Sequence, residues 1–408
     1  MNVKIILFDP YPHGMACTNR IHLYAKGIVE VGASVQILIP RPTEQNRETA
    51  RNTQIKGRFE GVDFLYTCGT TIRGSTFLMR RLLELHGLIG ATRELIRGVK
   101  KQNTRAVLFV GNDGVFILYF AIICKLLDII FLQEKSEIPF FNKPARTLLS
   151  EIYQRLYTKY IYKCFDGILV ISEALKKYFH KRICKRAKLL QLPIIVDTDE
   201  FFQATTLYKK PFTIAYCGNM SESQDGVLTL IRAFKLIADN FPEVRLILMG
   251  DTRNADDKQK VASLIRETRL SQKIILAGYL PRRQLIETLN SVSVLVLAKP
   301  SNLQSAYCFP SKLAEYLSTG NPVVVTDTGE ISNYLEDSLN AYLVEPGNVI
   351  ALAEKISFVL QNPRQASKVG ESGRVLAESL FSYRVHVKRI LDFIKNLESE
   401  KNAKVSAG

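Results

Sequence analysis

Short runs of aliphatic and β-branched residues recur along the chain, and each run is followed by a stretch with helical periodicity. Runs of this kind are typical of strands buried on both faces, as they are in a parallel sheet covered by helices. The alternation predicts an α/β protein with two doubly wound parallel sheets. The predicted strands are 3–9, 34–40, 106–111, 129–134 and 167–172 in the first half, and 212–218, 244–250, 273–280, 294–299 and 322–326 in the second.

The length of the chain favours two domains. Its 408 residues, of which 47% are hydrophobic, exceed what one core of typical size accommodates. The segment 191–202 has the character of a linker, because Pro193 interrupts its periodicity. We predict a first domain at 1–197 and a second at 198–380. The helical pattern at the end of the chain either packs within the second domain or crosses back to the first, and we assign 381–408 to the first domain as a returning helix.

The cysteine pattern argues against a disulfide framework and against a zinc site. The seven cysteines are scattered and never form a Cys-x-x-Cys pair. The first residues enter a strand directly, without the pattern of a signal peptide. The longest apolar run, 115–124, has about half the length that a membrane span needs, and we interpret it as a buried helix. These features predict a cytoplasmic protein.

The net charge of +16 is concentrated in the first half of the chain. Within 143–188, twelve Lys or Arg residues stand against three acids, and 156–162 is rich in both tyrosine and lysine. Such a stretch forms an ordinary solvated face, binds an anionic membrane surface or binds nucleic acid. Because no nucleic-acid motif accompanies the charge, we expect no nucleic-acid partner. The solvated face and the membrane surface both remain open.

The segment 307–325 combines a turn, a short helix and a β-branched run. Pro310 suits the first position of a helix, where a missing N–H costs nothing, and Gly320 suits the left-handed position that ends one. We therefore predict a helix of about ten residues between them. Ligands of open parallel sheets bind where loops leave the carboxyl ends of strands, and a helix start offers free N–H groups. The segment predicts a phosphate site with Lys312 as a nearby cation.

Several segments, taken in their order and spacing, resemble the retaining glycosyltransferases of family 4. The likeness covers nearly the whole chain and is strongest over 218–346. It implies the GT-B fold, in which two Rossmann-like domains face each other across a cleft. It also implies that the Asp-x-Asp at 197–199 is part of the crossing between domains rather than a metal site. The segments are 169–179, 191–202, 216–234, 244–251, 274–298, 309–335 and 340–348.

The resemblance implies a binding site for a sugar joined to a nucleoside diphosphate. In this family the second domain holds the donor and the first domain mainly holds the acceptor. Glu315 would accept hydrogen bonds from the ribose hydroxyls. Glycines after the first strand of each domain, Gly14 and Gly218, would let the backbone approach the donor, although a simple turn glycine explains Gly14 nearly as well. The diphosphate or sugar would bind to backbone groups of Phe309, Pro310, Ser311 and Lys312. The base would contact backbone groups of Tyr279 and Leu280.

This sequence departs from the family pattern at three places. The family often has a glutamate eight residues before the one that matches Glu315, but this chain has Tyr307. The basic pair that usually grips the diphosphate reads Asn219 and Gln224. These can donate only neutral hydrogen bonds, which are about half as strong as charge-assisted ones. We expect Lys312, Arg282 or Arg283 to supply the missing positive charge.

The third departure concerns the acceptor side. A histidine that often follows the fourth strand of the first domain is absent here, and 132–139 offers Glu134, Lys135 and Glu137 instead. We expect Glu134 or Glu137 to orient the acceptor or to offset positive charge on the sugar. Both glutamates are equally well explained as surface acids on a loop.

The resemblance implies transfer of a hexose from a nucleotide sugar to an acceptor hydroxyl, with retained anomeric configuration. Lys312 and the helix start near Pro310 would stabilise the departing diphosphate, so that no metal and no cofactor is expected. A glycan or lipid-linked acceptor, and work on surface polysaccharide at the inner face of the plasma membrane, would suit the basic first half. The alternatives are a non-catalytic partner subunit of the same fold, or a sugar-nucleotide epimerase or hydrolase.

Overall fold

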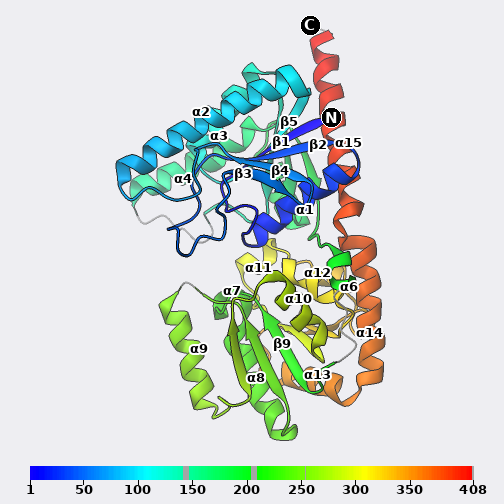
Figure 1. Ribbon diagram of the computed structural model, residues 1–408. Helices are drawn as coiled ribbons and strands as arrows, with labels where there is room; N and C mark the ends of the chain where they lie inside the picture. Colours follow the sequence, from blue (N-terminus) through cyan, green and yellow to red (C-terminus); the bar gives the residue numbers. More distant parts are fainter. Residues whose placement is uncertain (141–146, 204–208, 253, 407–408) are drawn as a thin grey trace. The chain divides into compact units, whose positions relative to one another are not determined.

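The computed structural model describes residues 1–140, 147–203, 209–252 and 254–406, which form two compact units (Figure 1). Unit 1 combines Met1–Pro193 with Tyr383–Gly408, and unit 2 is Ile194–Ser382. The sequence analysis placed these boundaries at 197 and 381. Both units are doubly wound sheets with helices on their faces.

Unit 1 contains an eight-stranded sheet with the order β3-β4-β2-β1-β5-β6-β7-β8. Every neighbouring pair is parallel except β3 and β4, which form an antiparallel hairpin at one edge. The five strands predicted for this half are confirmed, whereas β3, β4 and β8 were not predicted. The strand β3 is short and largely polar because it lies at the sheet edge, so the buried pattern is missing. The bounds are β1 (Asn2–Leu7), β2 (Ser34–Ile39), β3 (Lys56–Phe59), β4 (Val62–Tyr66), β5 (Thr104–Val110), β6 (Ile130–Lys135), β7 (Gly167–Val170) and β8 (Lys188–Gln191).

The last helix of the chain packs against the first helix of unit 1. A Cβ added at Gly27 would lie 2.2 Å from Cγ2 of Val387, so this glycine permits the close approach of α1 and α15. Tyr383 donates a hydrogen bond to Glu30 over 2.6 Å at the same contact. The helices of unit 1 are α1 (Ala16–Glu30), α2 (Phe77–Gln102), α3 (Gly114–Leu126), α4 (Leu148–Tyr160), the short η1 (Ile161–Cys164), α5 (Glu173–His180) and α15 (Tyr383–Ser406).

The interpretation of 115–124 as a buried helix is wrong in one respect. The segment lies in α3, which buries Ile117 and Phe120 but leaves Leu118 and Ile122 exposed. The helix covers the sheet with one face only, and its second face is as apolar as the first. Among the residues described, no helix is both long enough and apolar enough to cross a bilayer.

Unit 2 contains a six-stranded sheet with the order β11-β10-β9-β12-β13-β14, in which every neighbouring pair is parallel. All five strands predicted for this half are present, and β14 is additional. The bounds are β9 (Thr213–Cys217), β10 (Arg245–Met249), β11 (Ile274–Gly278), β12 (Val294–Leu297), β13 (Val323–Thr326) and β14 (Tyr342–Val344). The predicted α/β class, with two Rossmann-like parallel sheets, is therefore confirmed.

The middle of the second sheet positions the candidate site. The strands β12 and β13 are entirely buried and β9 is nearly so, because helices cover both faces. Their carboxyl ends lie at one edge of the sheet, since parallel strands all point the same way. The helices of unit 2 are α6 (Thr198–Gln203), α7 (Glu222–Asp225), α8 (Val227–Asn240), α9 (Ala255–Glu267), α10 (Arg282–Ser291), α11 (Leu303–Tyr307), α12 (Ser311–Ser318), α13 (Val349–Gln361) and α14 (Pro363–Leu376), with the shorter η2 (Ile331–Asn333) and η3 (Ala377–Phe381).

Candidate functional site

The predicted helix start near Pro310 is present, with a small correction. The helix α12 begins at Ser311, and Pro310 precedes it in an extended conformation with ψ 113° instead of occupying the first helical position. The helix has 8 residues, fewer than predicted. Gly320 follows the helix with φ +69°, as expected of a left-handed residue at a helix end. Ser311, the first residue of the helix, is exposed, whereas Leu313 and Ala314 in the same turn are buried.

The side chain of Phe309 anchors this turn in the core of unit 2. Its ring is buried, stacks on Tyr334 with centroids 5.0 Å apart, and meets Phe381 edge-on at 5.8 Å. Only the backbone of Phe309 is therefore available to a ligand. The rigid aromatic contact fixes where the amide groups of the following residues point.

A buried carboxylate, Asp225, receives the side chain of Lys312. The Lys312 ammonium lies 2.6 Å from Oδ2 of Asp225. The Tyr216 hydroxyl donates to the same oxygen over 2.8 Å, and the Asn219 N–H donates to it over 3.0 Å. Lys312 is a predicted site residue, whereas Asp225 is not, because an acid in a polar segment looks like a surface residue until its neighbours are known.

A second lysine, Lys299, reaches the same carboxylate from another strand. It lies two residues beyond the end of β12, and its ammonium is 3.7 Å from Oδ1 of Asp225. It also donates to the backbone oxygen of Gln224 over 2.7 Å. The sequence analysis missed Lys299 as a site residue. A lysine directly after a buried central strand was the signal that could have indicated it.

The two lysines and one carboxylate leave the cluster with a net positive charge. Burial alone would raise the pKa of Asp225, but Lys312, Lys299 and the hydrogen bonds outweigh it and hold the pKa below its usual value. The carboxylate is therefore ionised, and it keeps both ammonium groups at the carboxyl end of the sheet. The cluster supplies the positive charge that Asn219 lacks.

The two neutral residues that stand in place of the family's basic pair bond to each other. The Asn219 amide donates to Oε1 of Gln224 over 2.5 Å. Next to them, a Cβ added at Gly218 would lie 2.3 Å from Cε of Lys312. Gly218 thus leaves room for the lysine stem to cross the end of β9.

Glu315, one turn into α12, is not an exposed helix glutamate. Its side chain is 21% exposed, and its Oε1 accepts a hydrogen bond from Arg282 over 2.6 Å. Arg282 also donates to Glu200 over 2.7 Å and covers the ring of Phe201 at 5.4 Å. Burial opposes the charge of Arg282, yet Glu315 and Glu200 raise its pKa.

The expectation that Arg282 or Arg283 replaces the missing cations is not supported by their contacts. The charge of Arg282 is offset by the two carboxylates that it joins, and it holds Glu315 in place. Arg283 is almost fully exposed and pairs with Glu287 of its own helix over 2.9 Å. Lys299, rather than either arginine, joins Lys312.

Tyr279 and Leu280 lie away from this cluster in the order of the sheet. They follow β11, which is the edge strand and is separated from β9 by β10. Tyr279 is 54% exposed, and Gly278 before it has φ +63°. The structure therefore places the residues expected to contact a base two strands from those expected to contact phosphate.

Gly14 of unit 1 occupies a tight turn after β1. A Cβ there would lie 2.1 Å from Oγ1 of Thr18 and 2.6 Å from the carbonyl oxygen of Pro10. The Thr18 hydroxyl donates to that same oxygen over 2.8 Å. Packing of the turn is a sufficient reason for a glycine at this position.

The two acids predicted for the acceptor side differ in environment. Glu134 lies within β6 and is buried, so the interpretation as a surface loop acid is wrong for this residue. Arg20 binds it over 3.0 Å, and burial, only partly offset by Arg20, raises its pKa. Arg20 also donates to the carbonyls of Leu192 and Pro193 over 2.9 and 2.8 Å. Glu137, which follows the strand, is exposed.

The two aspartates of the Asp-x-Asp motif lie at the start of the helix α6. Asp197 is buried and its carboxylate accepts the N–H of Asp199 over 3.2 Å at the beginning of α6. Among the described residues, no group of three or more His, Cys, Asp or Glu side chains is arranged to hold a metal.

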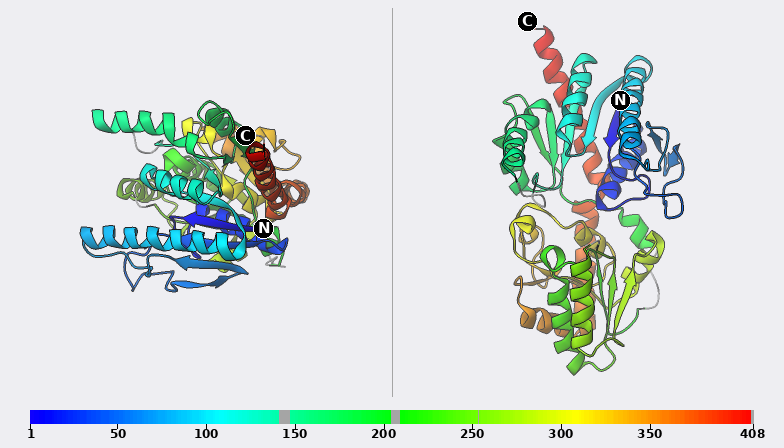
Figure 2. Two further views of the ribbon diagram at one scale, coloured as in Figure 1. Left: turned by 90° about the horizontal axis from the view of Figure 1, so that it is seen from above. Right: turned by 90° about the vertical axis from the view of Figure 1, so that its left-hand side faces the viewer.

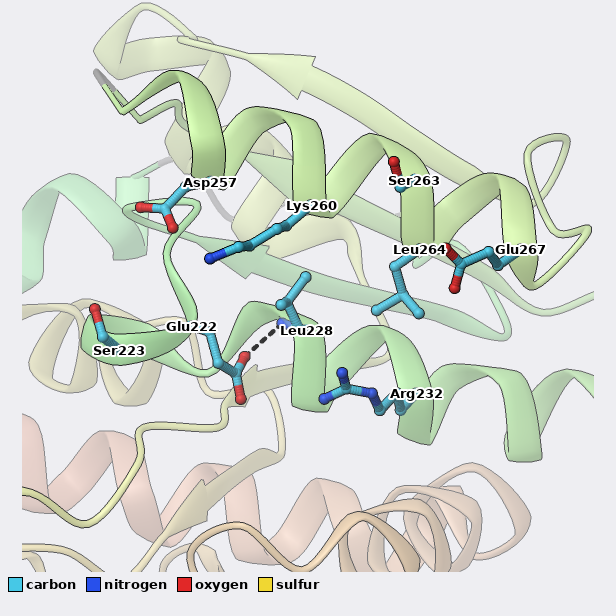
Figure 3. A pocket seen from close by; sticks show the side chains of 9 residues that line it. All are labelled: Glu222, Ser223, Leu228, Arg232, Asp257, Lys260, Ser263, Leu264 and Glu267. Atoms are coloured by element: carbon cyan, nitrogen blue, oxygen red, sulfur yellow. Dashed lines mark hydrogen bonds between the residues drawn. The ribbon is translucent and has the colours of Figure 1, made fainter.

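A hollow of about 620 Å³ opens between α8 and α9 (Figure 3). The Glu222 carboxylate lies at its edge and accepts the N–H of Leu228 over 2.7 Å, which caps α8. Lys260 and Arg232 project into it from the two helices. Of the residues described, the predicted site residues do not line this hollow, so we do not assign it a role in the site.

The fold of unit 2 and the cluster at its strand ends have features that suit a phosphate-bearing ligand. These features are a doubly wound sheet, a helix start and two lysines at the carboxyl edge of the sheet. Residues 197–376, which form most of unit 2, match the model of the family described as glycosyl transferases group 1.

Curated relatives share less than a third of their residues with this chain. The lipopolysaccharide 1,2-N-acetylglucosaminetransferase of Salmonella typhimurium is 22% identical over 243 residues, which cover 56% of this chain and 62% of the relative. The capsular polysaccharide biosynthesis glycosyltransferase CapM of Staphylococcus aureus is 25% identical over 238 residues, covering 54% and 59%. The chain thus spans about three fifths of the length of these two relatives.

Solved structures resemble the chain over nearly its whole length. Sucrose-phosphate synthase from Thermosynechococcus elongatus has a TM-score of 0.71 at 15% identity, covering 98% of this chain and 99% of that one. Anabaena HepE in complex with UDP and glucose has a TM-score of 0.68 at 14% identity, covering 97% and 100%. At these identities the likeness shows the fold alone, which is the GT-B fold.

Replacing Asp225 by asparagine is expected to destabilise the protein at neutral pH and far less in acid. The carboxylate has a lowered pKa in the folded state, so it contributes stability above the unfolded value of 3.8. That contribution is lost as pH falls through the folded pKa. Melting temperatures of both proteins at pH 7 and pH 3 measure the effect. A difference between the two proteins that is the same at both pH values would contradict the ionised cluster.

Proposed function

We propose that the protein is a retaining hexosyltransferase that moves a sugar from a nucleoside diphosphate to an acceptor hydroxyl. The observation that carries the proposal is the joining of Lys299 and Lys312 by Asp225 beside the start of α12. Two cations and a row of free amide groups at one edge of a sheet suit a diphosphate. The match of unit 2 to glycosyl transferases group 1 supports this reading.

Solved proteins of similar fold support a nucleotide as part of the donor. HepE has been solved with UDP-glucose, and pneumococcal O-GlcNAc transferase GtfA with UDP and GlcNAc. We propose that the Glu315 carboxylate accepts hydrogen bonds from the ribose hydroxyls, because Arg282 holds this carboxylate in one orientation. We propose that the base lies toward Tyr279 and Leu280, with Asn219 and Gln224 near the phosphates.

We propose that the transfer reaction requires neither a metal ion nor a cofactor. As the bond between sugar and diphosphate breaks, the leaving oxygen gains negative charge and the sugar becomes oxocarbenium-like. The amide groups at Ser311 and Lys312 and the two lysine ammonium groups would stabilise that oxygen. Asp225 would act as a positioning residue, because it holds the two lysine ammonium groups.

On the acceptor side, we propose that Glu137 is the acid that meets the acceptor and that Gly14 admits the donor sugar. Glu134 acts through Arg20, which ties the end of unit 1 to its sheet. The relatives named for lipopolysaccharide and capsular polysaccharide support a glycan or lipid-linked acceptor. The site of action would be the cytoplasmic face of an anionic membrane.

A panel of sugar nucleotides tests the donor site by thermal stabilisation. The matching donor at a hundred times its Kd is expected to stabilise the protein by about 2.7 kcal/mol. The variant Glu315→Ala should lose most of this shift. The control Glu287→Ala removes a glutamate that is also paired with an arginine in unit 2, and it should keep the full shift.

The outcomes distinguish the candidate functions. Donor binding followed by transfer to an added acceptor supports the transferase. Binding without any turnover would indicate a non-catalytic partner subunit, and turnover without an acceptor would indicate an epimerase or hydrolase. A panel that produces no shift, or an equal shift in Glu315→Ala, would refute the donor site.

A further inference from the structure

Three helices of unit 1 carry more than half of the large apolar side chains that the structure leaves exposed among the described residues. They are α2, α3 and α4, and Figures 1 and 2 show them running alongside one another on unit 1. Scattered exposed apolar residues are normal on a protein surface, but a contiguous apolar face marks an interaction site. We call the surface formed by the exposed apolar residues of these three helices the α2–α4 face.

The helix α2 has two apolar sides, and only one of them is used inside the protein. Gly87 and Leu95 are buried toward the sheet, and a Cβ at Gly87 would lie 1.8 Å from the carbonyl oxygen of Pro40. The outer side carries a second stripe at helical spacing, and its members are exposed. This stripe consists of Leu78, Leu82, Leu85, Ile89 and Ile96.

The neighbouring helices continue the stripe. The helix α3 exposes Leu118 and Ile122 one turn apart, and α4 exposes Leu149, Ile152 and Leu156. Direct contacts hold the three helices together as one surface. The hydroxyls of Thr92 in α2 and Tyr119 in α3 lie 2.8 Å apart. At Gly114 of α3, an added Cβ would lie 3.1 Å from the Tyr153 hydroxyl of α4.

The same helices are strongly basic. Together with η1 they contain ten Lys or Arg residues and three glutamates. Each glutamate pairs with an arginine of its own helix, as Glu84 does with Arg81 over 2.5 Å. At the end of α4, the Tyr160 ring lies 5.2 and 5.4 Å from the ammonium groups of Lys159 and Lys163. The elements that carry the apolar stripes therefore also carry an excess of positive charge.

A basic hollow extends this charge at the beginning of α2. It has a volume of about 300 Å³ and is lined by Arg73 and Arg80, together with Gly74 and Ser75. Arg80 donates to the carbonyl oxygens of Thr76 and Ser75 over 3.2 and 3.3 Å, which holds its guanidinium at the rim. An anionic headgroup beside the stripe would find two guanidinium groups there.

We propose that the α2–α4 face docks on the interface of an anionic lipid bilayer. The aliphatic side chains would enter the boundary between headgroups and acyl chains, and the surrounding Lys and Arg residues would meet the anionic headgroups. This inference deepens the membrane part of the proposed function, and it extends the surface beyond the basic segment 143–188 to α2 and α3. It does not depend on the donor site.

Two other occupants fit the face less well. A second copy of the chain would bring two faces of like charge together, which is unfavourable for association. A nucleic acid would satisfy the basic residues, but aliphatic stripes offer its bases no stacking surface. An anionic bilayer satisfies both the charge and the apolar stripes.

Sedimentation of the full chain with vesicles tests the proposal. Vesicles of phosphatidylcholine mixed with phosphatidylglycerol should bind the protein, vesicles of phosphatidylcholine alone should bind it weakly, and added salt should weaken binding. Each of Leu82→Asp, Ile122→Asp and Leu149→Asp should lower the partition coefficient by about tenfold or more, because a charge replaces an inserted side chain. The control Ile350→Asp changes a residue of unit 2 that is 64% exposed, compared with 59% for Ile122, and should bind as the unaltered protein does.

Further measurements keep the test decisive. The variants should keep the melting temperature of the unaltered protein, because they change exposed side chains. They should also keep the thermal shift produced by the donor, so that failure of docking and failure of the donor site are separate results. Unchanged sedimentation of all three variants would overturn the proposal. So would a dimer in gel filtration that the same variants dissociate, because the face would then bind a second copy.

Discussion

Replacing Lys312 by methionine is expected to lower kcat/KM for sugar transfer by about 10²- to 10³-fold. The methionine keeps most of the length of the side chain but removes the ammonium that would face the departing diphosphate. Lys299 remains, with its ammonium 3.7 Å from Asp225, and so some positive charge is retained. We expect the larger change in kcat, because the charge on the leaving oxygen develops only as the bond breaks. Steady-state kinetics with the donor identified by the panel measures the effect.

A matched lysine in the same unit separates catalysis from stability. Lys355 pairs with Asp337 over 3.0 Å, and its side chain is 27% exposed, compared with 23% for Lys312. Lys355→Met therefore removes the charge of a similarly exposed lysine away from α12, although its partner Asp337 is 45% exposed compared with 5% for Asp225. Its kcat/KM should stay within about twofold of the unaltered enzyme. If Lys312→Met and Lys355→Met have equal kinetics, the diphosphate is not held where we propose.

Replacing Arg20 by methionine is expected to destabilise the protein by about 3–5 kcal/mol. The substitution leaves Glu134 buried in β6 without its ionic partner. It also removes the guanidinium that donates hydrogen bonds to the carbonyl oxygens of Leu192 and Pro193 and so joins them to the rest of unit 1. Urea unfolding at pH 7 measures the loss.

The double variant Arg20→Met with Glu134→Leu identifies the source of the loss. Removing the carboxylate as well abolishes the uncompensated buried charge, so the double variant should be more stable than Arg20→Met alone. The pH dependence supplies a second readout. Burial already raises the pKa of Glu134, and without Arg20 it should rise further, so Arg20→Met should lose more stability at pH 7 than at pH 5. A double variant less stable than the single one would contradict this account.

Much of the fold could be predicted because its signals are local. The strands β9, β10, β12 and β13 each lie within the predicted bounds, since burial on both faces produces an apolar run of strand length. The edge strand β3 was missed because an edge strand need not be apolar, and β4 was missed because exposed Asp63 interrupts its apolar residues. The exposed face of α3 was also missed, since an apolar run does not tell whether a helix is covered on one side or on all sides.

The turn and the helix that form the candidate site could be predicted from the sequence, but the contacts between its side chains could not. Pro310, Gly320, Lys312 and Glu315 could be located from the sequence, because turn residues, helix length and family motif are all readable along one short segment. Arg282 was expected to supply charge, whereas the structure shows it joined to Glu200 and Glu315. The predicted strand 129–134 includes Glu134, but the sequence did not show whether this acid is a surface acid or a buried one, and the structure buries it in β6.

What the sequence determined by itself was the alternation of strands and helices, the start of α12 and the excess of positive charge in unit 1. The tertiary structure alone decided that Asp225 joins Lys299 to Lys312, and that three basic helices present their apolar stripes together. The physical reason is distance along the chain: helix and strand patterns depend on residues a few positions apart, whereas these contacts depend on which strands and helices become neighbours. The order β9, β12, β13 brings the ends of distant segments to one edge of the sheet, and no local pattern encodes that order.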